Sequence, residues 1–227
     1  MRLWTKLQAI LSATRRHTLG AALEALAERR VRRDESVFSI ALIALSAKMA
    51  KADGIVTDDE IEAFGDFFQF SEQDASKVRM VYDLAQQDVA GYEHYLSQVA
   101  RIFEAEPVVL EDVLDCLFHI AAADGVAHPR ELDLLQQAAE KFGISSVAFG
   151  RLKSIHLGLG DDDPYAILGI DPDIDDQALK RAYYKLAKDH HPDAMISRGV
   201  PESLVKIAEG RLAAINTAYE QICAARV

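Results

Sequence analysis

The sequence predicts an all-α protein in which a helical bundle with an internal repeat is followed by a small helical hairpin. Helix-favouring residues are abundant, apolar residues recur every three or four positions, and no segment alternates apolar with polar residues as a strand would. Of the 227 residues, 50% are hydrophobic and 27% are charged, which is typical of a folded soluble protein with one or two cores.

The first helix is expected within residues 1–16, with one apolar stripe flanked by basic side chains. The stripe consists of Leu3, Trp4, Leu7, Ile10 and Leu11. Two interpretations stay open, because such a helix packs either on its own domain or on the inner face of a membrane. We expect neither a signal peptide nor a spanning helix, since the most apolar run, 37–47, falls short of the roughly 20 residues that a bilayer requires.

A helix–turn–helix unit is expected twice in the bundle. The first copy has an apolar helix at 37–50 and a turn at 51–60, and the second has them at 108–121 and 122–131. An amphipathic helix follows each turn. The matching turn residues are Asp53, Gly54 and Glu60 in the first copy and Asp124, Gly125 and Glu131 in the second. The repeat predicts two similar units that pack together.

Helix ends explain much of this pattern. Gly54 and Gly125 can adopt the left-handed conformation that ends a helix. Residues 57–60 read Thr-Asp-Asp-Glu, which is a capping box for the next helix. In the second copy, Pro129 stands where a proline is tolerated in the first turn.

The carboxylates of the repeat offer an alternative interpretation, since clustered carboxylates are what hard divalent cations prefer. The candidate metal ligands are Asp53, Glu60, Asp124 and Glu131. Their spacing is not that of an EF-hand, because Ile55 and Thr57 stand where oxygen ligands should alternate. Capping accounts for the two glutamates without a metal, so no metal is assigned as a cofactor.

A linker rich in glycine and aspartate is expected at 158–163. Three helices follow it: a short one from Pro164, a second over 176–190 capped by Asp175 or Asp176, and a third over 202–222. The apolar face of the third helix is expected to carry Leu204, Ile207, Leu212, Ile215, Tyr219 and Ile222.

The second of these helices has two distinct faces. Leu179, Ala182, Tyr183 and Leu186 fit a small core. The opposite face carries Lys180, Arg181, Tyr184, Lys185 and Lys188. Side chains three and four positions apart are neighbours on a helix, so the latter five form one basic stripe. On a chain of net charge -11, such a stripe favours docking to a separate acidic surface.

His191-Pro192-Asp193 ends the basic helix. A residue that precedes proline is driven out of the helical region, and proline fixes its own backbone angle. We therefore expect a stiff loop that presents an imidazole and a carboxylate at the end of a cationic helix. The neighbouring His190 is interpreted as a surface residue or a cation at the helix end.

These three motifs together resemble a J domain, the family of DnaJ. The resemblance covers Asp163–Ile170, the helix with its basic stripe, the His191-Pro192-Asp193 loop and a third helix containing Asn216–Tyr219. It implies a co-chaperone that docks on a DnaK-type heat-shock chaperone through the loop and the stripe, and that stimulates the ATPase of that chaperone. It also implies that this chain is not itself an enzyme.

The bundle resembles a TerB-like domain of the tellurite-resistance type, through its two Ala-Asp-Gly turns and the glutamates that follow them. TerB-like domains precede the J domain in DjlA-type proteins. The resemblance implies a TerB-like domain over 1–157, which includes the helix at 1–16, then the linker at 158–163 and a J domain over 164–227. The TerB-like domain would direct or regulate the chaperone by binding a client or regulatory protein. The alternative function is a metal-binding stress sensor with a secondary J domain.

Composition argues against nucleic acid as a partner and favours a cytoplasmic location. The acidic chain disfavours nucleic acid, and the aspartates around the basic helix reinforce this. Cys116 and Cys223 lie far apart without zinc spacing, which indicates two reduced thiols in a cytoplasmic protein. We find no nucleophile, oxyanion site or phosphate-binding loop, so no catalytic residue and no cofactor is assigned. The sequence leaves the oligomeric state open.

Overall fold

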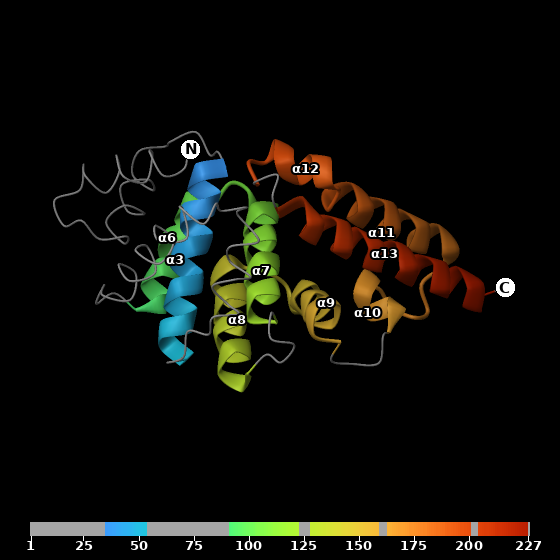
Figure 1. Ribbon diagram of the computed structural model, residues 1–227. Coiled ribbons are helices and arrows are strands. Elements are labelled where there is room, and N and C mark those ends of the chain that lie inside the picture. Colours follow the sequence, from blue (N-terminus) through green and yellow to red (C-terminus); the bar gives the residue numbers. More distant parts are fainter. Residues whose placement is uncertain (1–34, 54–90, 123–127, 159–162, 201–203, 227) are drawn as a thin grey trace.

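The computed structural model describes residues 35–53, 91–122, 128–158, 163–200 and 204–226 (Figure 1). Within these ranges every regular element is a helix, which agrees with the predicted fold class. None of the helices in the described part of the chain is both long enough and apolar enough to cross a membrane. The predicted helix at 1–16 lies outside these residues.

The described helices of the N-terminal bundle are α3 (Glu35–Asp53), α6 (Tyr92–Ile102), α7 (Pro107–Ala121), α8 (Pro129–Phe142) and α9 (Ser146–Leu157). The central helices are α3 and α7, which contact each other as well as α8. Every side chain from 38 to 49 is buried, and all but Ser39, Ser46 and Lys48 are apolar. A helix that is apolar on all sides is stable only inside a core, so α3 requires neighbours all round.

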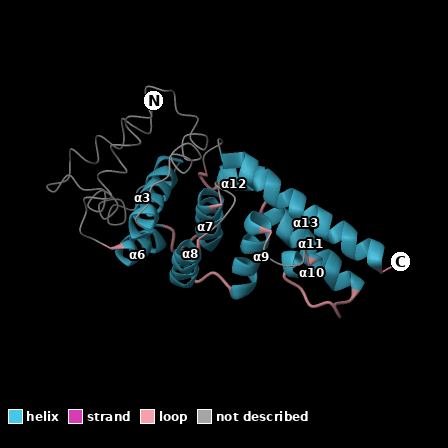
Figure 2. Ribbon diagram, turned by 60° about the horizontal axis from the view of Figure 1, so that its bottom comes forward, coloured by secondary structure: helices cyan, strands magenta, loops and turns pink. Residues whose placement is uncertain are grey.

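Among the described residues after 162, the C-terminal hairpin consists of α10 (Pro164–Leu168), α11 (Asp176–Asp189), α12 (Pro192–Ser197) and α13 (Val205–Ala225). The two long helices, α11 and α13, pack against each other, and α10 covers both (Figure 2). The hairpin has a core of its own, formed by Leu168, Leu179, Ile215, Ala218 and Ile222. The three helices that the sequence predicts here are confirmed, and α12 is an additional one.

The bundle and the hairpin pack directly on each other. Helix α10 lies against α9, and α13 contacts α7 (Figure 1). The core of the bundle continues into the hairpin, where it includes Met195, Val200, Leu204, Ile207 and Ala208. Leu204 and Ile207 are buried as the sequence predicts, but they pack in the core of the bundle. The end of the hairpin that carries α12 is therefore supported by the bundle.

The second copy of the predicted repeat has the expected local geometry at its second helix. Pro129 occupies the first turn of α8, and the Glu131 carboxylate accepts a hydrogen bond from the His128 backbone N–H at 2.8 Å. The capping role of Glu131 is thereby confirmed. Residues 54–60 of the first turn and 123–127 of the second lie outside the described residues, so the internal repeat itself stays a prediction.

Gly169 closes α10 at the point where the hairpin approaches the bundle. Its φ is +65°, and a Cβ added there would lie 2.5 Å from Cγ1 of Val147 in α9. Gly143 offers a control, because its φ is +69° and an added Cβ would meet nothing within 4 Å. We expect Gly143→Ala to lower the free energy of unfolding by about 1 kcal/mol and Gly169→Ala by about 2–3 kcal/mol, measured by chemical denaturation.

The additional cost at Gly169 should come from the Val147 side chain. Shortening that side chain with Val147→Ala should recover part of the loss in the double variant, because the clashing methyl group is removed. Equal losses for Gly143→Ala and Gly169→Ala would contradict the close approach of α10 to α9.

Candidate functional site

Helix α11 presents its basic stripe to solvent. Asp175 begins the helix by accepting a hydrogen bond from the Ala178 backbone N–H at 2.8 Å. The five side chains of the stripe, Lys180, Arg181, Tyr184, Lys185 and Lys188, are all exposed. Within the stripe, Lys180 Nζ lies 5.9 Å from the centre of the Tyr184 ring, a cation–π distance.

The opposite face of α11 is fixed by aromatic packing. Tyr183 stacks on Tyr219 of α13 at 4.1 Å between ring centres. Its hydroxyl donates a hydrogen bond to Oδ1 of Asn216 at 3.1 Å. Leu179 is buried in the hairpin core. These contacts set the rotation of α11 about its axis, and the rotation turns the stripe outward.

The loop residues form the first turn of α12 rather than an irregular corner. His191 has an extended backbone, with φ -66° and ψ 138°, and its Nδ1 accepts a hydrogen bond from the Asp193 backbone N–H at 3.2 Å. Pro192 occupies the first helical position, where its fixed φ suits a helix and its missing N–H costs nothing. The sequence-based expectation of a stiff loop did not include this helix start.

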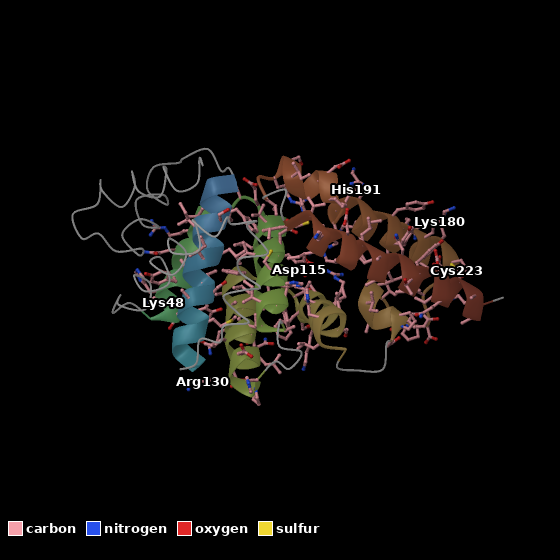
Figure 3. All side chains as sticks on the ribbon, viewed as in Figure 1. Lys48, Asp115, Arg130, Lys180, His191 and Cys223 are labelled. Carbon is pink, nitrogen blue, oxygen red and sulfur yellow. The ribbon has the colours of Figure 1, made fainter. Side chains whose placement is uncertain are left out.

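Both polar side chains of this turn are accessible. The side chain of His191 is 51% exposed and that of Asp193 is 89% exposed. Figure 3 shows His191 and Lys180 along the same upper edge of the hairpin, with His191 nearer the bundle. The imidazole, the carboxylate and the basic stripe thus share one solvent-facing surface, which we call the docking face.

His190 is not a surface residue, so its sequence-based interpretation is wrong. It is only 3% exposed, and its Nε2 lies 3.5 Å from Oε1 of Glu111 in α7. Burial lowers the pKa of His190 to about 2, and the nearby Arg211, Arg151 and Arg198 add to the effect. The imidazole is therefore neutral. The bundle lies against the end of α11 and buries the imidazole. Periodicity within α11 cannot reveal that contact.

A group of ionisable side chains, most of them buried, joins the bundle to the hairpin. We call it the interface cluster, and it comprises Glu111, Asp112 and Asp115 of α7, Arg151 and His156 of α9, and His190, Arg198 and Arg211 of the hairpin. Sequence reasoning missed this cluster entirely. Figure 3 shows Asp115 on the side of α7 that faces the hairpin.

Asp112 is the centre of the cluster. Its side chain is completely buried, and it accepts hydrogen bonds from Nη2 of Arg198 and Nη2 of Arg211, both at 2.8 Å. Arg198 also donates a hydrogen bond through Nη1 to the backbone carbonyl of Asp189, the last residue of α11, at 3.1 Å. Removing one partner from a buried ion pair costs about 3–5 kcal/mol, because the remaining charge is left buried without a partner.

Asp115 forms the second half of the cluster. Its carboxylate lies 3.1 Å from Nη1 of Arg211 and 2.6 Å from Nε2 of His156. Burial by itself raises the pKa of Asp115, but Arg211 and His156 outweigh it and hold the pKa below its usual value. Burial likewise lowers the pKa of Arg211, and the carboxylates of Asp115 and Asp112 raise it above the usual range. The pair is therefore charged at neutral pH.

A signal for the cluster does exist in the sequence. Arg211 stands midway between Ile207 and Ile215 at four-residue spacing, so it lies on the apolar face of α13. Asp112 and Asp115 interrupt the apolar helix α7 at three-residue spacing. Charges on apolar faces of two helices predict a buried pairing, although nothing in the periodicity says which helices meet.

Of the four candidate metal ligands, the side chain of Glu131 lies within the described residues. Glu60, Asp124 and the side chain of Asp53 lie outside the described residues. Glu131 is buried and its carboxylate serves the α8 cap. Among the residues that the structure describes, no group of three or more His, Cys, Asp or Glu side chains could hold a metal ion. Both cysteines are free thiols, with Cys116 buried and Cys223 half-buried.

The buried neutral His190 predicts a pH dependence of stability. The unfolded chain takes up a proton on this imidazole near its ordinary pKa of 6.5, whereas the folded chain does so only near 2. Acid therefore favours the unfolded state, and stability is lost as the pH falls below about 6.5. Between pH 7 and pH 5 the wild type should lose about 2 kcal/mol more of its unfolding free energy than His190→Gln does.

Urea denaturation of both chains at several pH values measures this difference. Parallel curves of unfolding free energy against pH would contradict a neutral, buried His190.

Comparisons with known proteins divide the chain into two matching regions. Residues 39–154 match the family model described as tellurite resistance protein TerB. Residues 163–226 match the DnaJ domain. Both resemblances inferred from the sequence are confirmed. No solved structure matches the chain.

Several curated proteins are similar to this chain, and some of them match it over most of its length. A protein of Pasteurella multocida is 24% identical over 83% of this chain and 79% of its own length, and one of Aliivibrio fischeri is 27% identical over 83% and 78%. A third, from Escherichia coli K12, is 30% identical over 48% and 49%. All three are named co-chaperone protein DjlA.

Proposed function

We propose, from the premise that the chain belongs to the TerB family over residues 39–154 and carries a DnaJ domain after it as the DjlA co-chaperones do, that it docks on a DnaK-type heat-shock chaperone and stimulates its ATPase. It is a co-chaperone of the J-domain class and not an enzyme. ATP hydrolysis takes place on the partner, so the task of this chain is recognition.

The observation that carries the proposal is the exposure of the whole docking face. His191 and Asp193 lie in solvent at the start of α12, directly beyond the basic stripe of α11. A cationic stripe steers an acidic partner into place, and a short polar turn at its end then gives specific contacts. We propose that Pro192 acts by fixing the backbone between the two polar side chains.

The roles of the other regions are proposals as well. We assign the TerB-like domain to 1–157, with its predicted repeat, the linker to 158–163 and the J domain to 164–227. The TerB-like domain would direct the activity to a client or regulatory protein, and residues 1–16 would give peripheral contact with a membrane. A cytoplasmic location is supported by the two free thiols. No observation on the described residues favours the metal-sensor alternative or nucleic-acid binding.

Two substitutions test the turn at the start of α12. His191→Gln and Asp193→Asn keep the size of each side chain and change its proton or charge. We expect each to lower the maximal stimulation of a DnaK-type chaperone's steady-state ATPase at least roughly tenfold, because we propose that these side chains act on the hydrolysis step itself, and loss of such an interaction lowers the rate at saturation. The unfolding midpoint should stay near that of the wild type, because both side chains are exposed. Full stimulation by both variants, or none by the wild type, would refute the proposed function.

The basic stripe predicts a dependence on ionic strength. Lys185→Ala combined with Lys188→Ala should raise the half-maximal concentration for ATPase stimulation about fivefold, because each exposed pair contributes up to about 1 kcal/mol. The half-maximal concentration should also respond less steeply to salt in this variant.

Arg130→Ala is the control for the stripe. Arg130 is also exposed and basic, but Figure 3 shows it on α8 at the opposite end of the molecule from His191. A similar effect from Arg130→Ala would mean that only the net charge matters.

A further inference from the structure

The two ends of the hairpin are stabilised by different cores. Leu168, Leu179 and Ile215 form the hairpin core around α10, α11 and the C-terminal part of α13. Met195 and Val200, which flank the end of α12, pack in the core of the TerB-like bundle. The segment that carries the docking turn is thus structurally a part of the bundle.

Polar contacts also join this end of the hairpin to the bundle. Arg198 follows α12 directly and binds both Asp112 of α7 and the backbone carbonyl of Asp189, the last residue of α11. One guanidinium therefore connects the end of the basic helix, the end of α12 and the bundle. Arg211 of α13 binds the other oxygen of the same carboxylate at 2.8 Å. Arg198, directly after α12, and Arg211 of α13 thus both bind Asp112, and α11 is joined to it through Arg198.

We propose that Asp112, a residue of the TerB-like domain, is a positioning residue for the co-chaperone activity, because it holds the His191-Pro192-Asp193 turn in place relative to the basic stripe through Arg198 and Arg211. This inference rests on the proposed function. The carboxylate is completely buried, so it cannot touch the chaperone itself. Any effect of Asp112 on chaperone stimulation must pass through the hairpin.

If the turn is no longer held in place, the apparent affinity for the chaperone should fall. A turn that spends only a fraction of its time in the competent position binds with an apparent dissociation constant raised by the inverse of that fraction. The chaperone still selects the competent state at saturation, so maximal stimulation is retained. This behaviour differs from that of His191→Gln, which removes a proposed direct contact and should lower the maximum.

The main variant is Asp112→Asn, which keeps the shape of the side chain and removes its charge. Hydrogen exchange on the full chain, without chaperone, should show faster exchange of the amides of Met195 and Val200, by about tenfold or more, whereas the amide of Leu179 should keep its wild-type rate. All three amides donate backbone hydrogen bonds in the folded chain. The half-maximal concentration for ATPase stimulation should rise about tenfold at an unchanged maximum.

The control is Val99→Ala, in α6 of the bundle. Val99 is completely buried, and α6 packs on α3 and α8. This substitution lowers stability without touching the interface cluster. Because Val99 and Met195 share the core of the bundle, it should change the exchange of Met195 and the half-maximal concentration much less than Asp112→Asn does. Equal effects of Val99→Ala and Asp112→Asn would mean that general destabilisation is responsible, and would overturn the proposal.

Arg198→Lys decides the matter if Asp112→Asn does not fold. Lysine keeps the charge that pairs with Asp112 but lacks the guanidinium fork that binds Asp112 and Asp189 together. Its exchange rates and half-maximal concentration should lie between those of the wild type and of Arg198→Ala. Wild-type values of both quantities in Arg198→Lys and Arg198→Ala would overturn the proposal.

The two measurements separate this proposal from the proposed function. If the wild type does not stimulate the chaperone, the function is refuted, and the exchange rates still decide whether Asp112 holds the turn. If the wild type stimulates but Asp112→Asn changes the exchange rates without changing the half-maximal concentration, the function stands and the positioning role is overturned.

Discussion

The burial of one carboxylate between two guanidinium groups is the constraint on which this structure depends. Asp112 lies inside the protein, where an unpaired charge would be very costly, and both of its partners come from the other part of the chain. The bundle and the hairpin must therefore meet in one specific arrangement. Apolar packing alone would allow several orientations, whereas a buried hydrogen-bonded charge pair penalises all but one.

This constraint explains how a small hairpin can present a long docking face. The hairpin core lies near α10 and stabilises only one end of α11 and α13. At the other end the polypeptide turns sharply between two helices, and its buried apolar residues lie outside the hairpin core. The bundle provides the missing support, by accepting Met195 and Leu204 into its core and by pairing with Arg198.

The two adjacent histidines at the turn differ sharply in exposure. His190 is buried and neutral, and His191 next to it is half exposed. His190 ends α11 and lies near Glu111 of the bundle, whereas His191 begins α12 in solvent. One belongs to the contact between the two parts of the chain and the other is available to a partner, so the same short segment serves both stability and recognition.

The sequence by itself determined the helical fold class, the family of each part, and the face of α11 that meets solvent, because these depend on local periodicity and on motifs of fixed spacing. It could not determine that α12 begins at Pro192, since six residues give no periodic signal. Only the tertiary structure decided that His190 is buried and that Arg211 pairs with Asp112, across 99 positions of sequence. Pairings of that kind depend on which helix faces pack together, and periodicity within one helix carries no information about its neighbour.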